Sequence, residues 1–358
     1  MSKVNTSDLV PGMILDSDVY NYNDQLILPE GLRLTDKAIM KLAFYSILSV
    51  NIKKVSYENP PSFEQTESSY SQRLKSSPEF IKFKHEFEET VELMKVSIND
   101  MVERNVPLNT DTLLENALKL LNSNNGEINV FDMVHNMRQY DDLTYAHSLN
   151  VGLICYVFAG WLGMSDQDTK LALECGLLHD VGKLKIPEVI IKKPQKLTDN
   201  EFEVIKTHPI EGYKILQKYP VSDHIKNAAL MHHERSDGSG YPLGLKGERI
   251  DKFARIVCIS DVYEAMTSVR IYRGSLCPFQ VIAAFESEGL QKYDTKMIMT
   301  FLENIVNTYI LNRVRLSNGM EGDIIFINKQ HLSRPTIKCG NQYIDLTKEP
   351  ELTIEAIV

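Results

Sequence analysis

A histidine and a carboxylate stand side by side in Leu177-Leu178-His179-Asp180-Val181-Gly182-Lys183, at the end of an apolar helical run. Adjacent side chains on a helix diverge by about 100°, so His179 and Asp180 can reach two neighbouring points of one pocket. Gly182 ends the run, and Lys183 follows it. An adjacent pair of this kind is common by chance. Its weight depends on whether the rest of the chain sends further ligands to the same place.

Five further candidate ligands occur in predicted helical stretches before and after this pair. Each has a plain alternative, because a lone inward-facing histidine is more often a hydrogen-bonded core residue than a ligand. They are His147 on an apolar stripe, His208 directly before Pro209, His232 and His233 on one side of a helix, and Asp261 on a second apolar stripe.

Together these residues form a set of nitrogen and oxygen ligands without cysteine, which suits two first-row metal ions. An ionised carboxylate such as Asp261 is costly on an apolar face unless it is paired or bound to a metal. Two metals about 3.5–4 Å apart can clamp the attacking and leaving oxygens of a phosphoryl displacement. Such a pair needs a bridging carboxylate, and Asp180 is the natural candidate.

The composition of the 358-residue chain is that of an ordinary globular protein, with 43% hydrophobic and 24% charged residues. The formal net charge of −9 argues against a protein that binds nucleic-acid polymers or anionic membranes, but it allows a small anionic ligand in a basic pocket. The five cysteines form no C-x-x-C motif, and no signal peptide or apolar run of about 18 residues occurs. We therefore expect a cytoplasmic protein in a reducing compartment, without a membrane segment.

The chain is predicted to be mainly α-helical and divides by pattern into five parts. Short strands and one helix predict a small α/β accessory module at 1–56, and a polar stretch rich in Ser and Pro predicts a linker at 57–78. Connecting helices follow at 79–128. A helical bundle at 129–309 then contains all the candidate ligands, and short strands predict a small β appendage at 310–358.

The predicted helix that begins near Glu79 is amphipathic. Its apolar residues recur at spacings of three and four: Phe80, Phe83, Phe87, Val91, Met94 and Ile98. This stripe either packs onto its own domain or forms the seam of a homodimer, and the pattern favours neither alternative.

Five segments resemble the motifs of the HD-GYP family, in the family's order and spacing. They are Thr144-x-x-His147-Ser148, Leu178-His179-Asp180-Val181-Gly182-Lys183-x-x-Ile186-Pro187, Thr207-His208-Pro209-x-x-Gly212, His232-His233-Glu234-x-x-Asp237-Gly238-Ser239-Gly240-Tyr241-Pro242 and Ser260-Asp261-Val262-Tyr263-x-Ala265-Met266-Thr267-Ser268. The Gly-Tyr-Pro segment separates this family from the wider HD superfamily. The N-terminal module also resembles a small domain that often precedes HD-GYP domains.

The resemblance implies an HD-type helical metallophosphodiesterase that linearises cyclic di-GMP to pGpG and, in some members, continues to GMP. Two divalent metals, iron or manganese, are the expected cofactors. A hydroxide bridging them would attack phosphorus, and Lys183 would hold a non-bridging phosphate oxygen. By motif matching, one metal would take His147, His179, Asp180 and Asp261, and the other would take Asp180, His208, His232 and His233.

The resemblance also implies contacts with substrate outside the ligand set. Arg270 and Arg273 match basic positions that would bind the second phosphate or the guanine edges, with a solvated helix end as the alternative. The segment Gly240-Tyr241-Pro242 would line the cleft. In the family this segment has been linked to protein partners, such as diguanylate cyclase domains.

Four positions depart from the family pattern. Leu143 stands one helical turn before His147, where some members carry a glutamate that binds a third metal. Because leucine cannot ligate a metal, the sequence predicts a dinuclear centre. Glu264 and Val269 replace residues that are usually aspartate, and Ile271 replaces a usual proline, which spares the ligands but bears on the affinity for substrate.

Two other functions stay open from the sequence. One is a hydrolase of another cyclic dinucleotide, and the other is a catalytically weak scaffold that reports cyclic di-GMP to partners. The complete set of ligands together with Lys183 favours an enzyme over a scaffold.

Overall fold

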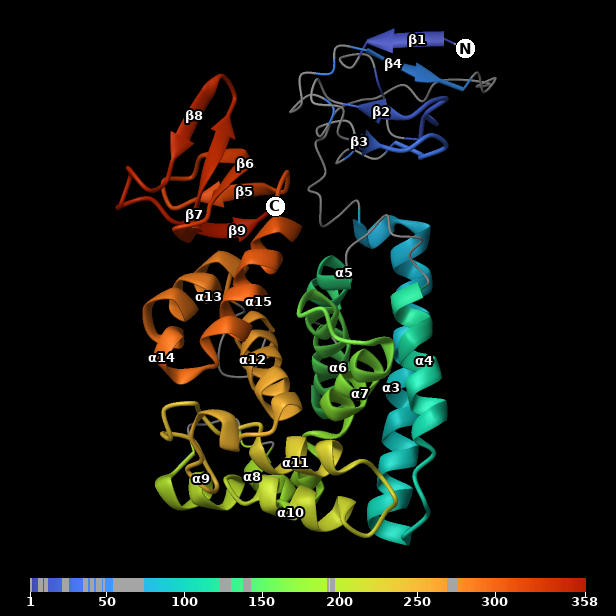
Figure 1. The fold of residues 1–358 in the computed structure, drawn as a ribbon, viewed down its shortest axis with the longest axis vertical. Helices are drawn as coiled ribbons and strands as arrows, with labels where there is room; N and C mark the ends of the chain where they lie inside the picture. The colour runs from blue at the N-terminus through green and yellow to red at the C-terminus, as the bar shows by residue number, and fades with distance from the viewer. Residues whose placement is uncertain are drawn as a thin grey trace. The chain divides into compact units, whose positions relative to one another are not determined.

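The computed structural model describes most of the chain from Leu74 onward and shorter stretches before it (Figure 1). The described residues are 2–5, 9, 12–20, 26–34, 38, 42, 47, 49–53, 74–122, 130–137, 143–191, 193, 197–268 and 276–358. The chain divides into two compact units, one formed by Met1–Arg73, Tyr309–Asn328 and Arg334–Val358 and the other by Leu74–Thr308 and Lys329–Ser333. The linker predicted at 57–78 lies mainly outside the described residues.

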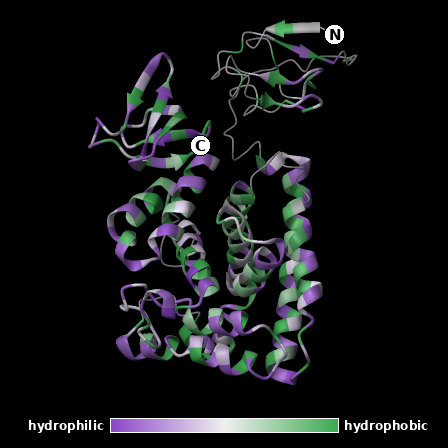
Figure 2. Ribbon diagram, in the orientation of Figure 1, coloured by the Kyte–Doolittle hydropathy of each residue, from purple (hydrophilic) through white to green (hydrophobic). Residues whose placement is uncertain are grey.

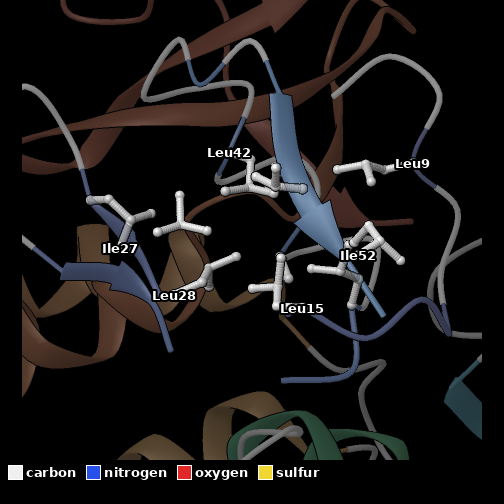
Figure 3. Close-up of a cluster of buried hydrophobic side chains, with 10 residues drawn as sticks. Leu9, Leu15, Ile27, Leu28, Leu42 and Ile52 are labelled. Carbon is white, nitrogen blue, oxygen red and sulfur yellow. The ribbon is translucent and has the colours of Figure 1, made fainter. Parts of the chain in front are cut away.

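The described part of the N-terminal module contains two small antiparallel sheets around a hydrophobic cluster. Strand β1 (Ser2–Asn5) pairs with β4 (Ser49–Ile52), and β2 (Val19–Tyr20) pairs with β3 (Leu26–Leu28). Burial of each large aliphatic side chain contributes about 1.5–3 kcal/mol to such a core. The buried side chains come from these strands and from the segments between them (Figure 3), and they include Leu9, Leu15, Ile27, Leu28, Leu42 and Ile52.

Helix α3 (Pro78–Arg104) begins after Ser77, whose hydroxyl accepts a hydrogen bond from the backbone N–H of Phe80. Figure 2 shows hydrophobic and hydrophilic residues alternating along this helix, as its amphipathic pattern predicts. All six side chains of the predicted stripe are buried within the single chain. The stripe therefore packs onto its own domain, which was the first of the two alternatives.

The remainder of the second unit confirms the predicted mainly helical fold. Its elements are α4 (Thr110–Asn122), α5 (Val130–Asn136), α6 (Leu143–Trp161), α7 (Asp166–Leu178), the 3-10 helix η2 (Val181–Lys185), α8 (Glu188–Ile191), α9 (Asp199–Ile205), α10 (His208–Leu216), α11 (Asp223–Met231), the 3-10 helix η3 (Gly247–Arg249), α12 (Lys252–Thr267), α13 (Pro278–Ala284), the π-helix η4 (Phe285–Gly289), α14 (Leu290–Lys292) and α15 (Thr295–Thr308).

Two glycines let α6 and α7 touch along their backbones. A Cβ atom on Gly176 would lie 2.6 Å from the Cα atom of Gly152, which is closer than a side-chain carbon can approach. Because of this contact, His147 of α6 and His179 at the end of α7 come together, with ring centroids 5.4 Å apart.

A third glycine places η2 against the start of α10. A Cβ atom on Gly182 would overlap the backbone of His208 and Gly212, so only glycine fits at this position. Asp180 directly precedes η2, and His208 is the first residue of α10. The contact between η2 and α10 therefore places Asp180 next to His208.

The tail forms a five-stranded antiparallel sheet, which confirms the predicted β appendage. Its strands are β5 (Arg313–Leu316), β6 (Glu321–Asn328), β7 (His331–Cys339), β8 (Gln342–Asp345) and β9 (Ile354–Ile357), in the order β8-β7-β6-β5-β9. Gly319 turns the chain between β5 and β6 with a φ of 81°, a conformation that favours glycine. Within the described residues, none of the helices could cross a membrane, given their length and polarity.

Candidate metal centre

The first group of candidate ligands comes from three elements of the helical unit. His147 lies on α6, His179 follows α7, and Asp261 lies on α12; one ligand atom of each falls within 4.8 Å of the others. The Nε2 atom of His147 lies 3.1 Å from Oδ1 of Asp261, and the Nε2 atom of His179 lies 4.0 Å from the same oxygen. These three residues therefore surround one small volume.

The second group is formed by three histidines from two elements. His208 begins α10, and His232 and His233 directly follow α11; one nitrogen of each falls within 4.8 Å of the others. The Nε2 atoms of His208 and His232 are 3.1 Å apart. Two ring nitrogens that face each other at this distance both point at a common centre.

Asp180 lies between the two groups and turns one oxygen to each. Its Oδ2 atom lies 3.3 Å from Nε2 of His179 and 3.6 Å from Nε2 of His147. Its Oδ1 atom lies 3.3 Å from Nε2 of His208 and 3.7 Å from Nε2 of His232. This is the arrangement that a carboxylate bridging two metal ions requires.

In His179, His208 and His232, the ring nitrogen that faces away from the centre is fixed by a hydrogen bond to the backbone. Nδ1 of His179 donates to the backbone oxygen of Gly176 over 2.7 Å. Nδ1 of His208 donates to the backbone oxygen of Ile205, also over 2.7 Å. Nδ1 of His232 lies 3.0 Å from the backbone oxygen of Ala229. Because Nδ1 holds the proton, the lone pair of Nε2 faces the centre, which is the tautomer that a metal ligand needs.

Buried polar atoms without a hydrogen-bond partner gather in the candidate centre. His179, Asp180, His208 and His232 are each at most 3% exposed. Among the described residues, Nε2 of His147, Nε2 of His179 and Oδ1 of Asp180 are buried side-chain atoms without a hydrogen bond. Buried polar groups are normally satisfied, so two such atoms in the first group and one that faces the second group fit divalent metals with nitrogen and oxygen ligands.

The pKa shifts in the centre follow from burial and charge. Burial lowers the pKa of His232 well below its usual value and that of His233 to about 3, so both rings are neutral. Burial acts against the charge of Asp180, but His179 and Lys183 overcome it and hold the pKa of its carboxyl well below the usual range. The neutral rings of His232 and His233 beside the ionised carboxylate of Asp180 are therefore ready to ligate a cation.

Glu264 supports His147 from behind the centre, a role that the sequence analysis missed. Burial would lower the pKa of His147, but the carboxylates of Glu264 and Asp261 raise it to about 9. Glu264 is 3% exposed, and its Oε2 lies 2.5 Å from Nδ1 of His147. Its Oε1 accepts hydrogen bonds from Asn150 (3.1 Å) and Ser268 (2.6 Å). The sequence signal was its position three residues after Asp261, on one face of α12.

Lys183 lies at the edge of the centre, beside Asp180. Its amino group forms a short ion pair with Oδ2 of Asp180, the oxygen that faces the first group. The Lys183 side chain is 27% exposed, whereas that of Asp180 is 2% exposed. The lysine is therefore the part of this pair that an incoming ligand can reach.

The Gly-Tyr-Pro segment folds back over the second group. The Tyr241 ring stacks on His233 with centroids 4.7 Å apart and planes 27° apart. A Cβ atom on Gly240 would overlap the backbone of Glu234 and Arg235, so glycine allows this close return of the chain. The turn continues through Pro242, which follows Tyr241 in a cis peptide bond.

Glu234 holds this loop in place and was also missed from the sequence. Its side chain is buried, with 1% exposure for the residue. Its two carboxylate oxygens accept hydrogen bonds from the backbone N–H of Leu243 (2.7 Å) and Leu245 (2.9 Å).

Arg270 and Arg273, which the family resemblance implies as substrate contacts, lie outside the described residues. The side chain of Leu143, at the start of α6, is likewise not described.

Comparison with known proteins identifies the helical unit. The family described as HD domain matches residues 109–297, more than half of the chain. The chain belongs to the HD domain family. The Gly-Tyr-Pro segment beside the histidines places it in the HD-GYP group.

Relatives with curated names match part of this HD domain protein. A cyclic di-GMP phosphodiesterase of Pseudomonas aeruginosa is 34% identical over 203 residues, which cover 56% of this chain and 49% of that protein. A 3'3'-cGAMP-specific phosphodiesterase of Vibrio cholerae is 36% identical over 170 residues, which cover 47% of this chain and 39% of that protein. The chain thus spans half or less of the length of these relatives.

Among solved structures, an HDGYP protein of Bdellovibrio bacteriovorus is similar to this HD domain protein. The match has 16% sequence identity and a TM-score of 0.48, and it covers 85% of this chain and 99% of the other.

Proposed function

We propose that this protein is a metal-dependent phosphodiesterase that hydrolyses cyclic di-GMP to pGpG, with GMP from a second cleavage as the alternative final product. The observation that carries the proposal is the position of Asp180, with one oxygen toward each group of candidate ligands. The relatives from Pseudomonas aeruginosa and Vibrio cholerae, which are named as phosphodiesterases of cyclic dinucleotides, support the substrate class.

The ligands fall into two sets that share Asp180. Two ions of iron or manganese, when bound, supply the positive charge that activates a water and stabilises the phosphoryl oxygens. Neutral imidazoles and ionised carboxylates are the ligands that such ions accept. The first set is His147, His179, Asp180 and Asp261, and the second is Asp180, His208, His232 and His233.

Lys183 contributes the phosphate contact. In the structure its amino group is paired with Asp180. When Asp180 shares its charge with cations, Lys183 is free to turn to a non-bridging phosphate oxygen. There it neutralises the negative charge that develops on that oxygen in the transition state.

The loop that carries Tyr241 forms one side of the substrate site in this proposal. Tyr241 covers His233 and is itself held through Glu234. Arg270 and Arg273 are proposed to bind the second phosphate or a guanine edge from their segment after α12. Leu243, 54% exposed next to Pro242, extends the surface that a protein partner such as a diguanylate cyclase domain would contact.

A second candidate substrate is 3'3'-cGAMP. The specific support is the relative of that specificity in Vibrio cholerae, which matches this chain as well as the cyclic di-GMP phosphodiesterase does. Both compounds contain the phosphodiester bond at which the proposed metal ligands are directed, so these ligands do not distinguish the two substrates. Comparison of kcat/KM for the two compounds decides between them.

The test is a hydrolysis assay on protein purified without oxygen and loaded with iron or manganese. Chromatography is expected to show cyclic di-GMP converted to pGpG, with loss of activity by at least about a thousandfold in Asp180→Ala, because both sets lose their shared ligand. Elemental analysis should give two metals per wild-type chain. Full activity in Asp180→Ala would exclude the proposed mechanism, and an inactive, metal-loaded wild type would exclude the proposed activity.

A further inference from the structure

We propose that Phe202, in the middle of α9, and Lys206, directly after α9, form a subsite that holds one purine base of the cyclic dinucleotide. The inference rests on the proposed function and deepens it, because it names residues that recognise the base rather than the reacting phosphate. The ligand class is a flat aromatic base that carries a phosphate close by.

Helix α9 is fixed to the candidate metal centre at one end and capped at the other. His208 donates from Nδ1 to the backbone oxygen of Ile205, the last residue of α9, over 2.7 Å. Thr198 and Glu201 close the other end of α9 as a capping box. Phe202 precedes Ile205 by three residues, so their side chains are neighbours on the helix surface, with Cβ atoms about 5–6 Å apart.

A continuous line of contacts leads outward from the centre to Phe202. Tyr241 stacks on His233 at 4.7 Å, and the amino group of Lys206 lies 5.9 Å from the Tyr241 ring. The same amino group lies 5.4 Å from the Phe202 ring, within the range of a cation–π contact. Phe202 is 47% exposed at the end of this line.

The exposed ring and the lysine match complementary parts of a nucleotide. Single exposed apolar side chains are common on protein surfaces and need no ligand. Phe202 differs because it adjoins a cation that also contacts the ring over His233. The lysine is paired with Glu203 at 2.5 Å, but Glu203 is 67% exposed, and such surface pairs hold their partners weakly. A base can therefore stack on Phe202 while Lys206 turns to a phosphate oxygen.

Kinetics of the metal-loaded protein test the subsite with two substrates. These are cyclic di-GMP and methyl 4-nitrophenyl phosphate, a diester without a base. Phe202→Ala is expected to raise KM for cyclic di-GMP, relative to the base-free diester, by about tenfold to a hundredfold, the range of lost base stacking. Phe202→Leu should behave like Phe202→Ala, because leucine is apolar but offers no ring. Lys206→Met should also raise KM for cyclic di-GMP.

The matched control is Val204→Ala. Val204 is an exposed apolar residue of the same helix, two positions after Phe202, and it points to a different side. Its kinetic constants are expected to equal those of the wild type. If Phe202→Ala turns over cyclic di-GMP with the wild-type KM, the subsite is wrong and the proposed function stands. If the wild type neither binds nor hydrolyses cyclic dinucleotides, the proposed function fails and the subsite fails with it.

Fluorescence gives a second readout that does not depend on turnover. Trp161 is the single tryptophan of the chain, so a tryptophan introduced at the surface is measured against one background. Addition of cyclic di-GMP should quench the fluorescence of Phe202→Trp, because a stacked base contacts the indole, and leave that of Val204→Trp unchanged. Equal quenching in the two variants would overturn the proposal.

Discussion

Glu264 shows how a residue outside the ligand set prepares the candidate centre. Its carboxylate contacts Nδ1 of His147 and is itself held by Asn150 and Ser268. The pKa of Glu264 is lowered: burial works against its charge, but the nearby His147 outweighs burial, so the carboxylate is ionised. A buried carboxylate held by two donors cannot turn away, and it keeps Nε2 of His147 pointed at Asp180 and Asp261.

We expect Glu264→Gln to weaken metal binding at the set that contains His147. The neutral amide has almost the same shape, but it no longer stabilises the proton on Nδ1 of His147. Loss of such a supporting contact typically costs about 10–100-fold in metal affinity. Calorimetric titration of the metal-free protein with manganese measures this change in affinity.

Glu264→Asp serves as the control for this prediction. It keeps the charge and shortens the side chain by one methylene, so its affinity for manganese should lie between those of the wild type and Glu264→Gln. If Glu264→Gln binds two manganese ions with wild-type affinity, Glu264 does not position His147.

At the scale of elements, the close packing of α6 on α7 brings the first group together. Gly152 and Gly176 remove the side chains that would otherwise separate the two helices. The histidines on these helices then lie within reach of one ion. The same glycines therefore serve both stability and the geometry of the site.

Gly176→Ala is predicted to lower the free energy of unfolding by about 1–3 kcal/mol, the usual cost of overpacking a rigid contact. The added methyl group would lie 2.6 Å from the Cα atom of Gly152, which is backbone and cannot move aside alone. Urea denaturation of the metal-free protein isolates this effect from stabilisation by bound metal.

Gly160→Ala is the matched control on the same pair of helices. A Cβ atom there would meet no other atom within 4 Å. Because alanine is the better helix former, this substitution should stabilise the protein by up to about 1 kcal/mol. If Gly176→Ala has the same free energy of unfolding as the wild type, α6 and α7 can move apart without loss of stability, and the prediction is wrong.

At the scale of the molecule, one half-buried carboxylate makes stability depend on pH. Burial of Glu174 on α7, together with the nearby charge of Asp111 on α4, raises the pKa of Glu174 to about 7. The folded state therefore binds this proton more tightly than the unfolded state, in which the usual value is 4.5. Its contribution to stability is complete below pH 4.5 and is lost as the pH rises to about 7.

Removal of this titration is predicted to make the protein less sensitive to pH. The free energy of unfolding of the wild type, minus that of Glu174→Gln, should fall by about 1 kcal/mol as the pH rises from 4.5 to 8, after allowance for screening by solvent. Denaturation curves at several pH values measure the difference. An unchanged difference across this range would mean that Glu174 ionises freely in the folded protein.

Much of the candidate site could be predicted from the sequence, because its ligands occur in motifs of fixed spacing. The structure brings His147, His179, Asp180, His208, His232, His233 and Asp261 together. Glu234 and Glu264 were missed, because their importance depends on which backbone and side-chain groups approach them. Leu243 and Leu245 reach Glu234 only after the loop has folded back with Tyr241 stacked on His233.

The sequence by itself determined the helical class, the β tail and the identity of the candidate ligands, because helical periodicity and residue chemistry are local properties. Only the tertiary structure decided that the two oxygens of Asp180 face separate groups of histidines. The distances between helices depend on packing, here on the contact of Gly152 with Gly176 and of Gly182 with His208. These contacts join residues from distant parts of the chain, so they arise only when the helices pack together.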